Sequence, residues 1–373
     1  MGGLEVIVSV SNIIDVFDKD MYKGCKNRKK LYSFEMFKMS NINYIYDVLK
    51  TGNYSMQNYN IFIIKYPKYR VVMSLKMNDK VINHYITKYA LMPKLTKYLD
   101  DRNIATRKDM GCSYGVKLVK RYIELNKKYG KFYALKIDIR KYLYNIDHKI
   151  LKSMLKELDD VEYKLICKII DSTNESYVNK WIDYLKNKEL MYDNRKKEIM
   201  DIPHYELGKG LPIGNMTSQF LAIYYLNKLD HFIVHNLRLT HMIRYMDDYV
   251  LIHKDKEYLK ECLNIIEYKL NNEYELLINK KKSKIYSIED GFDFLGYKFK
   301  VINGKTIVRE SPKTINNVVK RVKHNVRKYN NNNLKFYYNS INNYYYSFIC
   351  ISVRETGNTD LAAARAAIIT NRR

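Results

Sequence analysis

The sequence predicts an α+β fold, with an antiparallel sheet that carries helices on one face. Two patterns support this prediction. The segment 132–139 is typical of a compact buried strand, and the segment 242–253 has strand character on both sides of a two-acid centre, which predicts a hairpin. Helical patterns separate the two segments. The 373 residues include only 5 Pro and 14 Gly and show no repeat of solenoid period, so we expect one continuous architecture.

The first third of the chain alternates between helical and strand patterns. Residues 1–58 are mixed and mostly helical in pattern. Residues 61–75 alternate like two strands around a turn at Pro67 and Lys68. The stretch 79–130 is helical, with a polar break at 100–113.

The rest of the chain is mainly helical around the predicted hairpin. Helical patterns continue to about residue 186, and a charged loop then leads to a helix that opens at 210–214 and runs to Phe232. Another helix is expected at 257–271. From Ser311 the pattern is helical and basic, then Tyr-rich, then Ala-rich.

Charge indicates the class of partner. The chain carries 66 Lys and Arg against 40 Asp and Glu, a net charge of +26. AT-rich coding would explain abundant Lys, Asn and Tyr, but it does not explain the excess of base over acid, because Asp and Glu codons also tolerate AT-richness. The excess therefore favours a nucleic-acid partner. The longest apolar runs are too short to cross a bilayer. No basic region precedes the apolar run near the N-terminus, which argues against a secretory signal, so we expect a soluble, cytoplasmic protein without a membrane partner.

Cysteine and histidine give little indication of chemistry. The five Cys are widely spaced and form no CxxC pair, which predicts reduced and mostly buried side chains. The eight His show no evident metal-ligand spacing.

Three carboxylates point to metal-dependent chemistry. The string Tyr245-Met246-Asp247-Asp248 is weak evidence alone, because a solvated turn would look the same. Asp138, however, ends a buried strand, where a carboxylate has no structural purpose unless it faces a site. Neighbouring strands could place Asp138 beside Asp247 and Asp248, and such a cluster suits two Mg²⁺ ions, with Mn²⁺ as a substitute. This chemistry is that of a nucleotidyltransferase.

Five segments resemble, in the right order, the successive motifs of bacterial reverse transcriptases, the group shared by group II introns, retrons, diversity-generating retroelements and defence-associated enzymes. They are IDIRKYLYNIDH at 137–148, GLPIGNMTSQ at 210–219, RYMDDYVLI at 244–252, NKKKS at 279–283 and FLGY at 294–297. Segments 66–86 and 103–111 look like the fingers motifs of the same group, and 336–359 resembles a thumb more faintly. The resemblance implies a right-hand polymerase fold with fingers, palm and helical thumb.

The same resemblance implies a domain organisation and a role for individual residues. The domains would be an N-terminal extension at 1–58, fingers and palm at 59–300, and a basic thumb with a tail at 301–373. Asp138, Asp247 and the backbone carbonyl of Ile139 would bind the metals, with Asp248 assisting, and Lys282 would protonate the departing pyrophosphate. The residues that would contact nucleotide or template are Lys68, Arg70, Arg107, Leu143, Gly214 and Gln219. The primer grip would be Phe294, Leu295, Gly296 and Tyr297. Taken alone, each basic residue would more simply be a solvated surface charge.

Two motif positions depart from the commonest pattern. Five residues after Asp138, most relatives carry Phe or Tyr as a gate against the ribose 2′-OH, and here that residue is Leu143. Ile213 before Gly214 and Gln219 after Ser218 resemble the diversity-generating type, in which a loosened template pocket accompanies misincorporation opposite adenine. Defence-associated lineages share this form. No maturase, endonuclease or retron-type thumb signature is visible, which argues against an intron enzyme or a retron.

The expected partners are an RNA template, a DNA or RNA primer and dNTPs, with a small basic accessory protein or a dedicated non-coding RNA as a further partner. In the thumb region, basic residues could track a template–primer backbone or form a solvated helix face: Lys320, Arg321, Lys323, Arg327 and Lys328. A non-catalytic RNA-binding protein on a polymerase scaffold is the alternative from another class. The intact carboxylate set argues against it.

Overall fold

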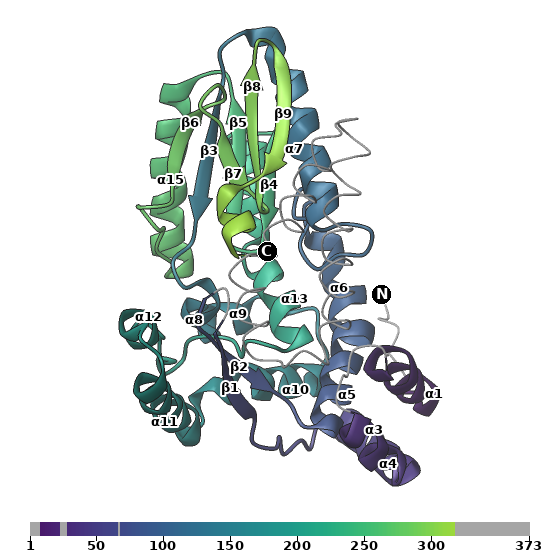
Figure 1. Cartoon of the computed structure of the whole chain (residues 1–373). Coiled ribbons are helices and arrows are strands. Elements are labelled where there is room, and N and C mark those ends of the chain that lie inside the picture. Colours follow the sequence, from purple (N-terminus) through teal and green to yellow (C-terminus); the bar gives the residue numbers. More distant parts are fainter. Residues whose placement is uncertain (1–7, 23–27, 66–67, 318–373) are drawn as a thin grey trace, which may run out of the picture.

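A computed structural model describes residues 8–22, 28–65 and 68–317 (Figure 1). Residues 312–317 are helical, as expected from Ser311 onward. The basic thumb stretch at 320–328 and the Tyr-rich and Ala-rich segments after it lie outside the described residues. Within the described part of the chain, no helix is long and apolar enough to cross a membrane.

The central sheet has four antiparallel strands in the order β4-β5-β3-β6. They are β3 (Tyr133–Asp138), β4 (Met242–Tyr245), β5 (Asp248–His253) and β6 (Lys284–Ser287). The predicted buried strand is β3, and the predicted hairpin is β4 and β5, so both predictions are confirmed. β3 lies between β5 and β6, with Asp138 opposite Asp248 and Leu135 opposite both Leu251 and Ile285.

Both faces of this sheet are covered, so the expectation of helices on one face is wrong. Successive side chains of a strand point to opposite faces. Ala134 and Val250 pack in a cluster with α7 (Cys112–Asn126), whereas Leu135 and Leu251 pack in the main core with α13 (Met216–Tyr225) and α15 (Lys256–Tyr274). The strands are apolar on both faces, which is the pattern of a sheet buried between two layers.

A second sheet lies against the α7 side of the first. Its strands are β7 (Phe292–Phe294), β8 (Tyr297–Ile302) and β9 (Lys305–Glu310), in that order. Phe292, Phe294 and Phe299 fill the space between this sheet and α7. Residue 300, where a domain boundary is expected, lies inside β8, which pairs with β9 as far as Glu310. The division into domains stays a prediction.

The predicted strand pair at 61–75 is confirmed as β1 (Asn60–Ile64) and β2 (Arg70–Ser74), which pair antiparallel. This two-stranded sheet has its own small core with α11 (Ser176–Tyr192) and α12 (Lys196–Met200). The helix α12 falls in the stretch predicted as a charged loop. Its Ile199 is fully buried, and this single apolar anchor is too weak a signal to reveal a helix in the sequence.

The remaining described elements are helical. They are α1 (Val10–Asp15), η1 (Val16–Met21), α3 (Arg28–Glu35), α4 (Lys38–Thr51), α5 (Met77–Tyr85), η2 (Ile86–Leu91), α6 (Met92–Leu95), η3 (Thr96–Tyr98), η4 (Lys127–Tyr129), α8 (Tyr142–Asn145), α9 (His148–Ser153), α10 (Asp160–Asp171), η5 (Ser172–Asn174), α14 (Asn227–His231) and η6 (Phe232–Asn236). The N-terminal helices α1, η1, α3 and α4 contribute buried residues to the main core and contact α5.

The cysteines differ in burial from the expectation. Among those that the structure describes, Cys262 is buried, Cys167 is half-buried and Cys112 is exposed, and all three are free thiols. That the cysteines are reduced stays a prediction. The prediction that most are buried is wrong for these three, because Cys112 begins α7 at an exposed position.

Candidate active site

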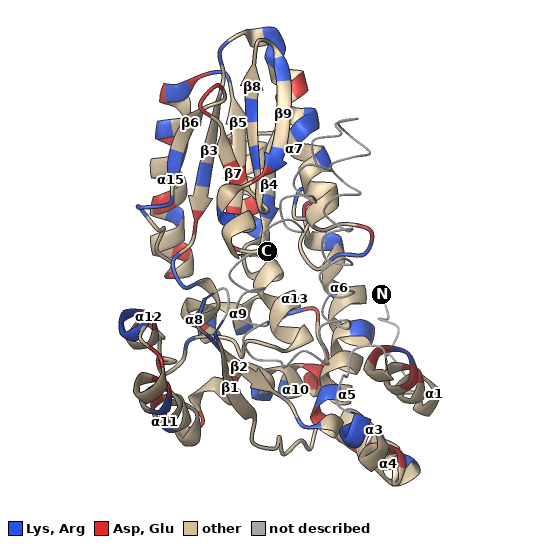
Figure 2. Ribbon diagram, in the orientation of Figure 1, with Lys and Arg blue, Asp and Glu red and all other residues tan. Residues whose placement is uncertain are grey.

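Three carboxylates meet at one end of the central sheet. Asp138 is the last residue of β3 and Asp248 the first of β5, and the two face each other across the pairing of these strands. Asp247 lies in the two-residue turn between β4 and β5, where Met246 has a positive φ of 56°. The backbone N–H of Ile139 donates to the carbonyl of Asp247 at 3.2 Å, which ties the turn to the end of β3. Figure 2 shows acidic residues at this end of β3.

Electrostatics at this cluster favour a bound cation. Burial, together with the charges of Asp248 and Asp138, raises the pKa of Asp247 to about 6. Burial also raises the pKa of Asp248, although Lys136 lowers it in part. Oδ1 of Asp248 is buried and accepts no hydrogen bond within the described residues. A divalent cation coordinated by carboxylate oxygens would relieve both the mutual repulsion and the unsatisfied oxygen, so the donor set fits such an ion.

Two lysines supply positive charge to the cluster. The Nζ of Lys282 lies 2.9 Å from Oδ1 and 2.7 Å from Oδ2 of Asp138. The Nζ of Lys136 lies 3.7 Å from Oδ1 of Asp248 and donates to the backbone carbonyl of Asp293 at 3.0 Å. Lys136 therefore links a carboxylate of the central sheet to the second sheet.

The segment before β6 holds Asp138 by its backbone. The N–H of Asn279 donates to the carbonyl of Asp138 at 2.7 Å, and the N–H of Asp138 donates to the Ser283 hydroxyl at 3.1 Å. The predicted motif NKKKS is thus a turn that positions both the carboxylate and the lysine that contacts it.

A fully buried ion pair stabilises the β4–β5 turn from the protein interior. The guanidinium of Arg244 on β4 donates to both carboxylate oxygens of Asp230 on α14, and neither side chain is exposed. The same guanidinium donates to the carbonyl of Met246 at 3.1 Å and to that of Ile223 at 2.7 Å. The Tyr249 hydroxyl donates to the same Asp230 carboxylate at 2.9 Å. The backbone of the residue before Asp247 is therefore held from inside the protein.

Basic residues gather beside the carboxylates. Burial, followed by the charges of Lys282, Lys313 and Arg70, lowers the pKa of Lys68. These cations come from β2 and the segment before it, the turn before β6, and the helix that begins after Ser311. Because neighbouring cations repel, this arrangement suits a polyanionic ligand such as a triphosphate. Lys313 was not predicted, and its solvated position on a basic helix gives no distinguishing signal in the sequence.

The structure places Arg107 in a structural position. Its guanidinium donates to the carbonyls of Asp100 at 2.8 Å and Asn103 at 3.2 Å, and it pairs with Asp101 at 3.3 Å. These bonds hold the loop between η3 and α7. A contact of Arg107 with phosphate or template remains a prediction.

The predicted nucleotide-pocket residues lie between β2 and α13. The N–H of Met73 in β2 donates to the carbonyl of Ile213 at 2.8 Å. Gly214 follows with φ of 120°, and a Cβ there would lie 3.1 Å from Cγ1 of Val72 and 3.2 Å from the Met73 carbonyl, so glycine permits this close approach. Gln219 on α13 is exposed.

The predicted gate residue belongs to the short helix α8. Leu143 is half-buried and packs against the main core, and its carbonyl accepts a bond from the Leu211 N–H at 2.7 Å. Its neighbour Tyr144 stacks on Tyr205 with ring centroids 4.7 Å apart. Burial raises the pKa of Tyr144 to about 12, with Arg70 among the groups that oppose the rise. An aromatic ring therefore lies near the predicted triphosphate-binding arginine, one residue after the expected position.

The predicted primer grip is the turn between β7 and β8. Phe294 and Tyr297 are buried, whereas Leu295 and Gly296 form the turn with φ of 50° and 85°. A Cβ at Gly115 on α7 would lie 2.5 Å from Cδ1 of Leu295, so this glycine makes room for the turn. The carbonyl of Gly296 accepts bonds from the Ser311 N–H and the Thr314 hydroxyl, which attaches the next helix to the turn.

At this end of the central sheet the structure brings together Asp138, Ile139, Asp247, Asp248 and Lys282, with Lys68 and Arg70 nearby. Arg107 bonds to its own loop, and the contacts of the other predicted residues with nucleotide, template or primer remain predictions. Sequence reasoning missed Lys136, Arg244 and Lys313. It also missed a cluster of Asp100, His231 and His235, whose candidate ligand atoms all lie within 4.8 Å of one another. The spacing His-x-x-x-His within a helical pattern is the signal that would have found the two histidines, because residues four apart share a helix face.

A carboxylate cluster at the end of an antiparallel sheet, with lysine and arginine beside it, is an arrangement that suits a nucleotidyltransferase. The family described as "Reverse transcriptase (RNA-dependent DNA polymerase)" matches residues 63–299, and the chain belongs to this family.

Among solved structures, the chain is similar to a C-terminally truncated apo telomerase from Candida tropicalis, with a TM-score of 0.45 and 15% identity over 69% of this chain and 55% of that one. It is also similar to telomerase from Candida albicans in complex with a fragment of telomeric RNA, with a TM-score of 0.43 and 15% identity over 74% of this chain and 51% of that one. This chain thus spans about half the length of these telomerase chains. No curated protein matches the sequence.

Proposed function

We propose that this protein copies an RNA template into cDNA by two-metal nucleotidyl transfer, extending a DNA or RNA primer with dNTPs. The observation that supports this most is the meeting of Asp138, Asp247 and Asp248 beside the cluster of Lys68, Arg70, Lys282 and Lys313, in a chain of the reverse transcriptase family. Phosphoryl transfer requires carboxylates that bind metal cations and basic side chains that bind the phosphates, and both groups are present here.

Each group has a place in the reaction. Asp138, Asp247 and the Ile139 carbonyl, with Asp248 assisting, would hold two Mg²⁺ ions, for which Mn²⁺ can substitute. These ions supply Lewis-acid stabilisation of the attacking and leaving oxygens when bound. Arg70 and Lys68 bind and orient the triphosphate. Lys282 holds a proton at Nζ that it delivers to the departing pyrophosphate.

Primer extension on an RNA template tests this proposal. Asp247→Ala is expected to abolish detectable synthesis, because it removes a carboxylate from the cluster. Asp290→Ala serves as the control, because Asp290 is exposed in the turn between β6 and β7. Equal synthesis by wild type and Asp247→Ala would overturn the mechanism.

We infer further that the protein serves in a diversity-generating retroelement. Ile213 before Gly214 and the exposed Gln219 support this inference, because they match the motif form associated with a loosened template pocket. Sequencing of cDNA made on a defined RNA is expected to show errors concentrated opposite template adenine. Uniform accuracy at all four bases would instead favour a role in antiphage defence.

The alternative of a non-catalytic RNA-binding protein predicts a different result. Such a protein would bind RNA but would not bind Mg²⁺ together with a dNTP. Isothermal titration calorimetry of the wild type with dNTP and Mg²⁺ distinguishes the catalytic from the non-catalytic protein. We expect the wild type to bind dNTP with Mg²⁺ and Asp247→Ala to bind them more weakly.

A further inference from the structure

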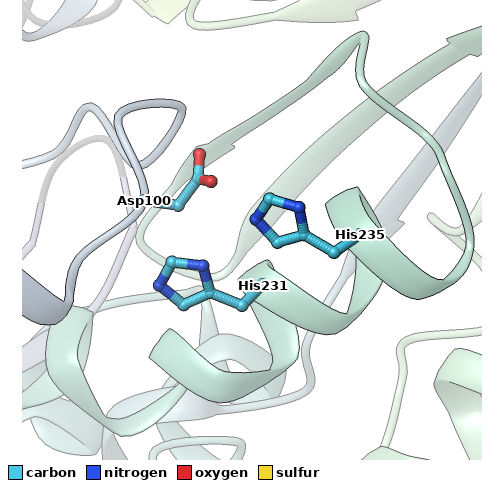
Figure 3. Close-up of side chains that lie close together, drawn as sticks. All are labelled: Asp100, His231 and His235. Atoms are coloured by element: carbon cyan, nitrogen blue, oxygen red, sulfur yellow. The ribbon is translucent and has the colours of Figure 1, made fainter.

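A cluster of two histidines and one aspartate lies outside the polymerase site. His231 ends α14 and His235 lies in η6, and their rings stack with centroids 5.7 Å apart and an interplanar angle of 11°. Asp100 reaches them from the loop that follows η3. Figure 3 shows a ring nitrogen of each histidine turned toward the side of the cluster where the Asp100 carboxylate lies.

We propose that Asp100, His231 and His235 form a binding site for a transition-metal ion of the Zn²⁺ class, separate from the carboxylate cluster that would hold the polymerase metals. The ligand set selects the ion. Imidazole nitrogens suit Zn²⁺, Co²⁺ or Ni²⁺, whereas Mg²⁺ takes oxygen ligands almost exclusively. Two histidines and one carboxylate are also a known three-ligand set for zinc, which leaves the fourth position to water.

The hydrogen bonds around the cluster prepare its ligand atoms. Nε2 of His231 lies 2.9 Å from the backbone carbonyl of Tyr98, so this nitrogen carries the proton and Nδ1 keeps its lone pair. Metal-binding histidines typically donate their second ring nitrogen to a carbonyl or carboxylate in this way. The bond fixes the tautomer and the ring orientation before any ion arrives.

Asp100 is held in place equally firmly. The N–H of Arg102 donates to Oδ1 at 2.8 Å, and the Arg102 guanidinium lies 3.1 Å from both oxygens. The Arg107 guanidinium holds the Asp100 carbonyl. Among the described residues, the Arg102 guanidinium supplies the one hydrogen bond that Oδ2 accepts, so this oxygen retains a lone pair for a metal. Arg102 also donates to the Thr240 carbonyl at 2.9 Å, which steadies this guanidinium beside the carboxylate.

The distances suit closure on an ion. The candidate ligand atoms lie within 4.8 Å of one another. Zinc–ligand bonds of about 2.0–2.2 Å place two ligands of a tetrahedral ion roughly 3.4 Å apart, so the ligand atoms would move together by at most about 1.4 Å. His235 is exposed and can make this adjustment by rotation of its side chain.

The position of the site indicates a supporting rather than a catalytic role. His231 directly follows Asp230, which pairs with Arg244, and the carbonyl of Arg102 accepts the Arg244 N–H at 2.9 Å. A bound ion would therefore fasten together the two segments that flank Arg244, and Arg244 holds the turn that carries Asp247. The ion would stabilise the palm beneath the active site.

Titration with Co²⁺ tests the proposal directly, because Co²⁺ bound by histidine gives visible absorption bands. Tag-free, full-length, metal-stripped protein is titrated in excess Mg²⁺, which occupies the carboxylate cluster. We expect one Co²⁺ per chain, displaced by Zn²⁺, and we expect Zn²⁺ to raise the melting temperature.

Variants locate the ion. His235→Ala is expected to weaken Co²⁺ binding at least about 10-fold and to abolish the thermal shift. Its fold, checked by circular dichroism, should be intact because His235 is exposed. Asp247→Asn should bind Co²⁺ as the wild type does. His204→Ala is the matched control, because this exposed histidine pairs with the single carboxylate of Asp183 at 2.7 Å. Absence of bands in the wild type, or equal binding by His235→Ala, would overturn the proposal.

Discussion

Arg244 shows how one buried charge can serve both stability and the active site. Its guanidinium is fully enclosed and is satisfied by Asp230 and by two backbone carbonyls, one of which belongs to Met246 beside Asp247. Burial of a charged pair contributes little net stability, but removal of one partner leaves the other charge uncompensated. Loss of Arg244 alone is therefore expected to destabilise the fold by much more than the intact ion pair stabilises it.

Arg244→Met is expected to lower the free energy of unfolding by about 3–5 kcal/mol, because Asp230 would stay buried without its partner. The double variant Arg244→Met with Asp230→Leu should recover much of this loss in urea unfolding. Primer extension by the double variant should stay impaired, because the Met246 carbonyl has lost its donor. Arg309→Met is the control, because Arg309 is an exposed residue of β9. Full activity in the double variant would show that the turn does not depend on Arg244.

Asp247 should make stability depend on pH when no divalent ion is present. Burial and the charge of Asp248 raise its pKa to about 6, above the value of about 3.9 in an unfolded chain. The folded state therefore holds this proton more tightly, and the stability it contributes is complete below about pH 4 and lost as the pH rises through 6. In EDTA, Asp247→Asn should be more stable than wild type by roughly 1–3 kcal/mol at pH 8.

Urea unfolding of both proteins between pH 5 and 8 measures this difference, which should shrink as the pH falls. Asp290→Asn, which replaces an exposed carboxylate in the turn between β6 and β7, should show no such trend. A constant difference between Asp247→Asn and wild type at every pH would contradict the prediction.

Leu143 is the residue to test for sugar selectivity. A branched aliphatic side chain leaves more room at the expected gate than an aromatic ring does. Leu143→Phe is therefore expected to raise the preference for dNTP over rNTP by roughly 10-fold or more in primer extension, a difference of about 1.4 kcal/mol in transition-state free energy. Tyr144→Phe, which keeps the neighbouring ring, is the control. If Leu143→Phe left the preference for dNTP over rNTP unchanged, Leu143 would not be the residue that excludes the ribose 2′-OH.

At the scale of elements, the β7–β8 turn connects the second sheet with the chain that follows it. Gly296 has φ of 85°, and its carbonyl accepts the bonds from Ser311 and Thr314 with which the next helix begins. The turn of the other hairpin, at Gly304, has a similar φ of 75° but open space around it. The two glycines therefore share a backbone conformation and differ in their surroundings.

Gly296→Ala and Gly304→Ala should each cost about 1–2 kcal/mol from the left-handed backbone alone. Only Gly296→Ala adds a contact of 3.1 Å between the new Cβ and Oγ1 of Thr314. We expect this variant, and not Gly304→Ala, to weaken binding of a primer–template duplex in a fluorescence anisotropy assay. Equal effects of the two variants would show that the contact with Thr314 has no role.

Elements with a strong local signal could be predicted from the sequence. The compact apolar run at 132–139 and the strand character on both sides of Asp247 and Asp248 predict β3, β4 and β5, and the same strands place Asp138 beside Asp248. The covering of both sheet faces was not predicted, because α7 lies before β3 in the chain and its amphipathic pattern does not reveal which face it covers. The buried pairing of Arg244 with Asp230 is likewise a tertiary contact, invisible to periodicity.

At the scale of the whole molecule, the excess of 26 positive charges gives a long-range field that concentrates polyanions. Part of this excess lies near the carboxylates, where the charges of Lys282 and Lys313 help to lower the pKa of Lys68. The sequence supports the class of partner well. Which individual lysines contact phosphate depends on how distant segments come together, as the unpredicted Lys313 illustrates.

Binding of RNA should therefore fall steeply with salt. If roughly 6–10 phosphates are neutralised, affinity should drop about 10³- to 10⁵-fold between about 50 and 200 mM salt, as measured by fluorescence anisotropy. Lys313→Gln should reduce the slope by about one, whereas Lys260→Gln on the far helix α15, where the lysine pairs with Glu257, should leave it unchanged. A shallow slope in the wild type would mean that few phosphates are contacted.

The ion pair between Lys282 and Asp138 has a thermodynamic consequence. Both oxygens of Asp138 contact the ammonium, so the lysine and a divalent ion compete for one carboxylate. This competition is reciprocal. The ion pair weakens binding of a divalent ion by a certain free energy, and binding of that ion weakens the ion pair by the same free energy. If the carboxylates bind a divalent ion as proposed, the ion pair would restrain the proton donor until that ion binds, and occupancy of the metal site would determine how much of the lysine is free to donate its proton.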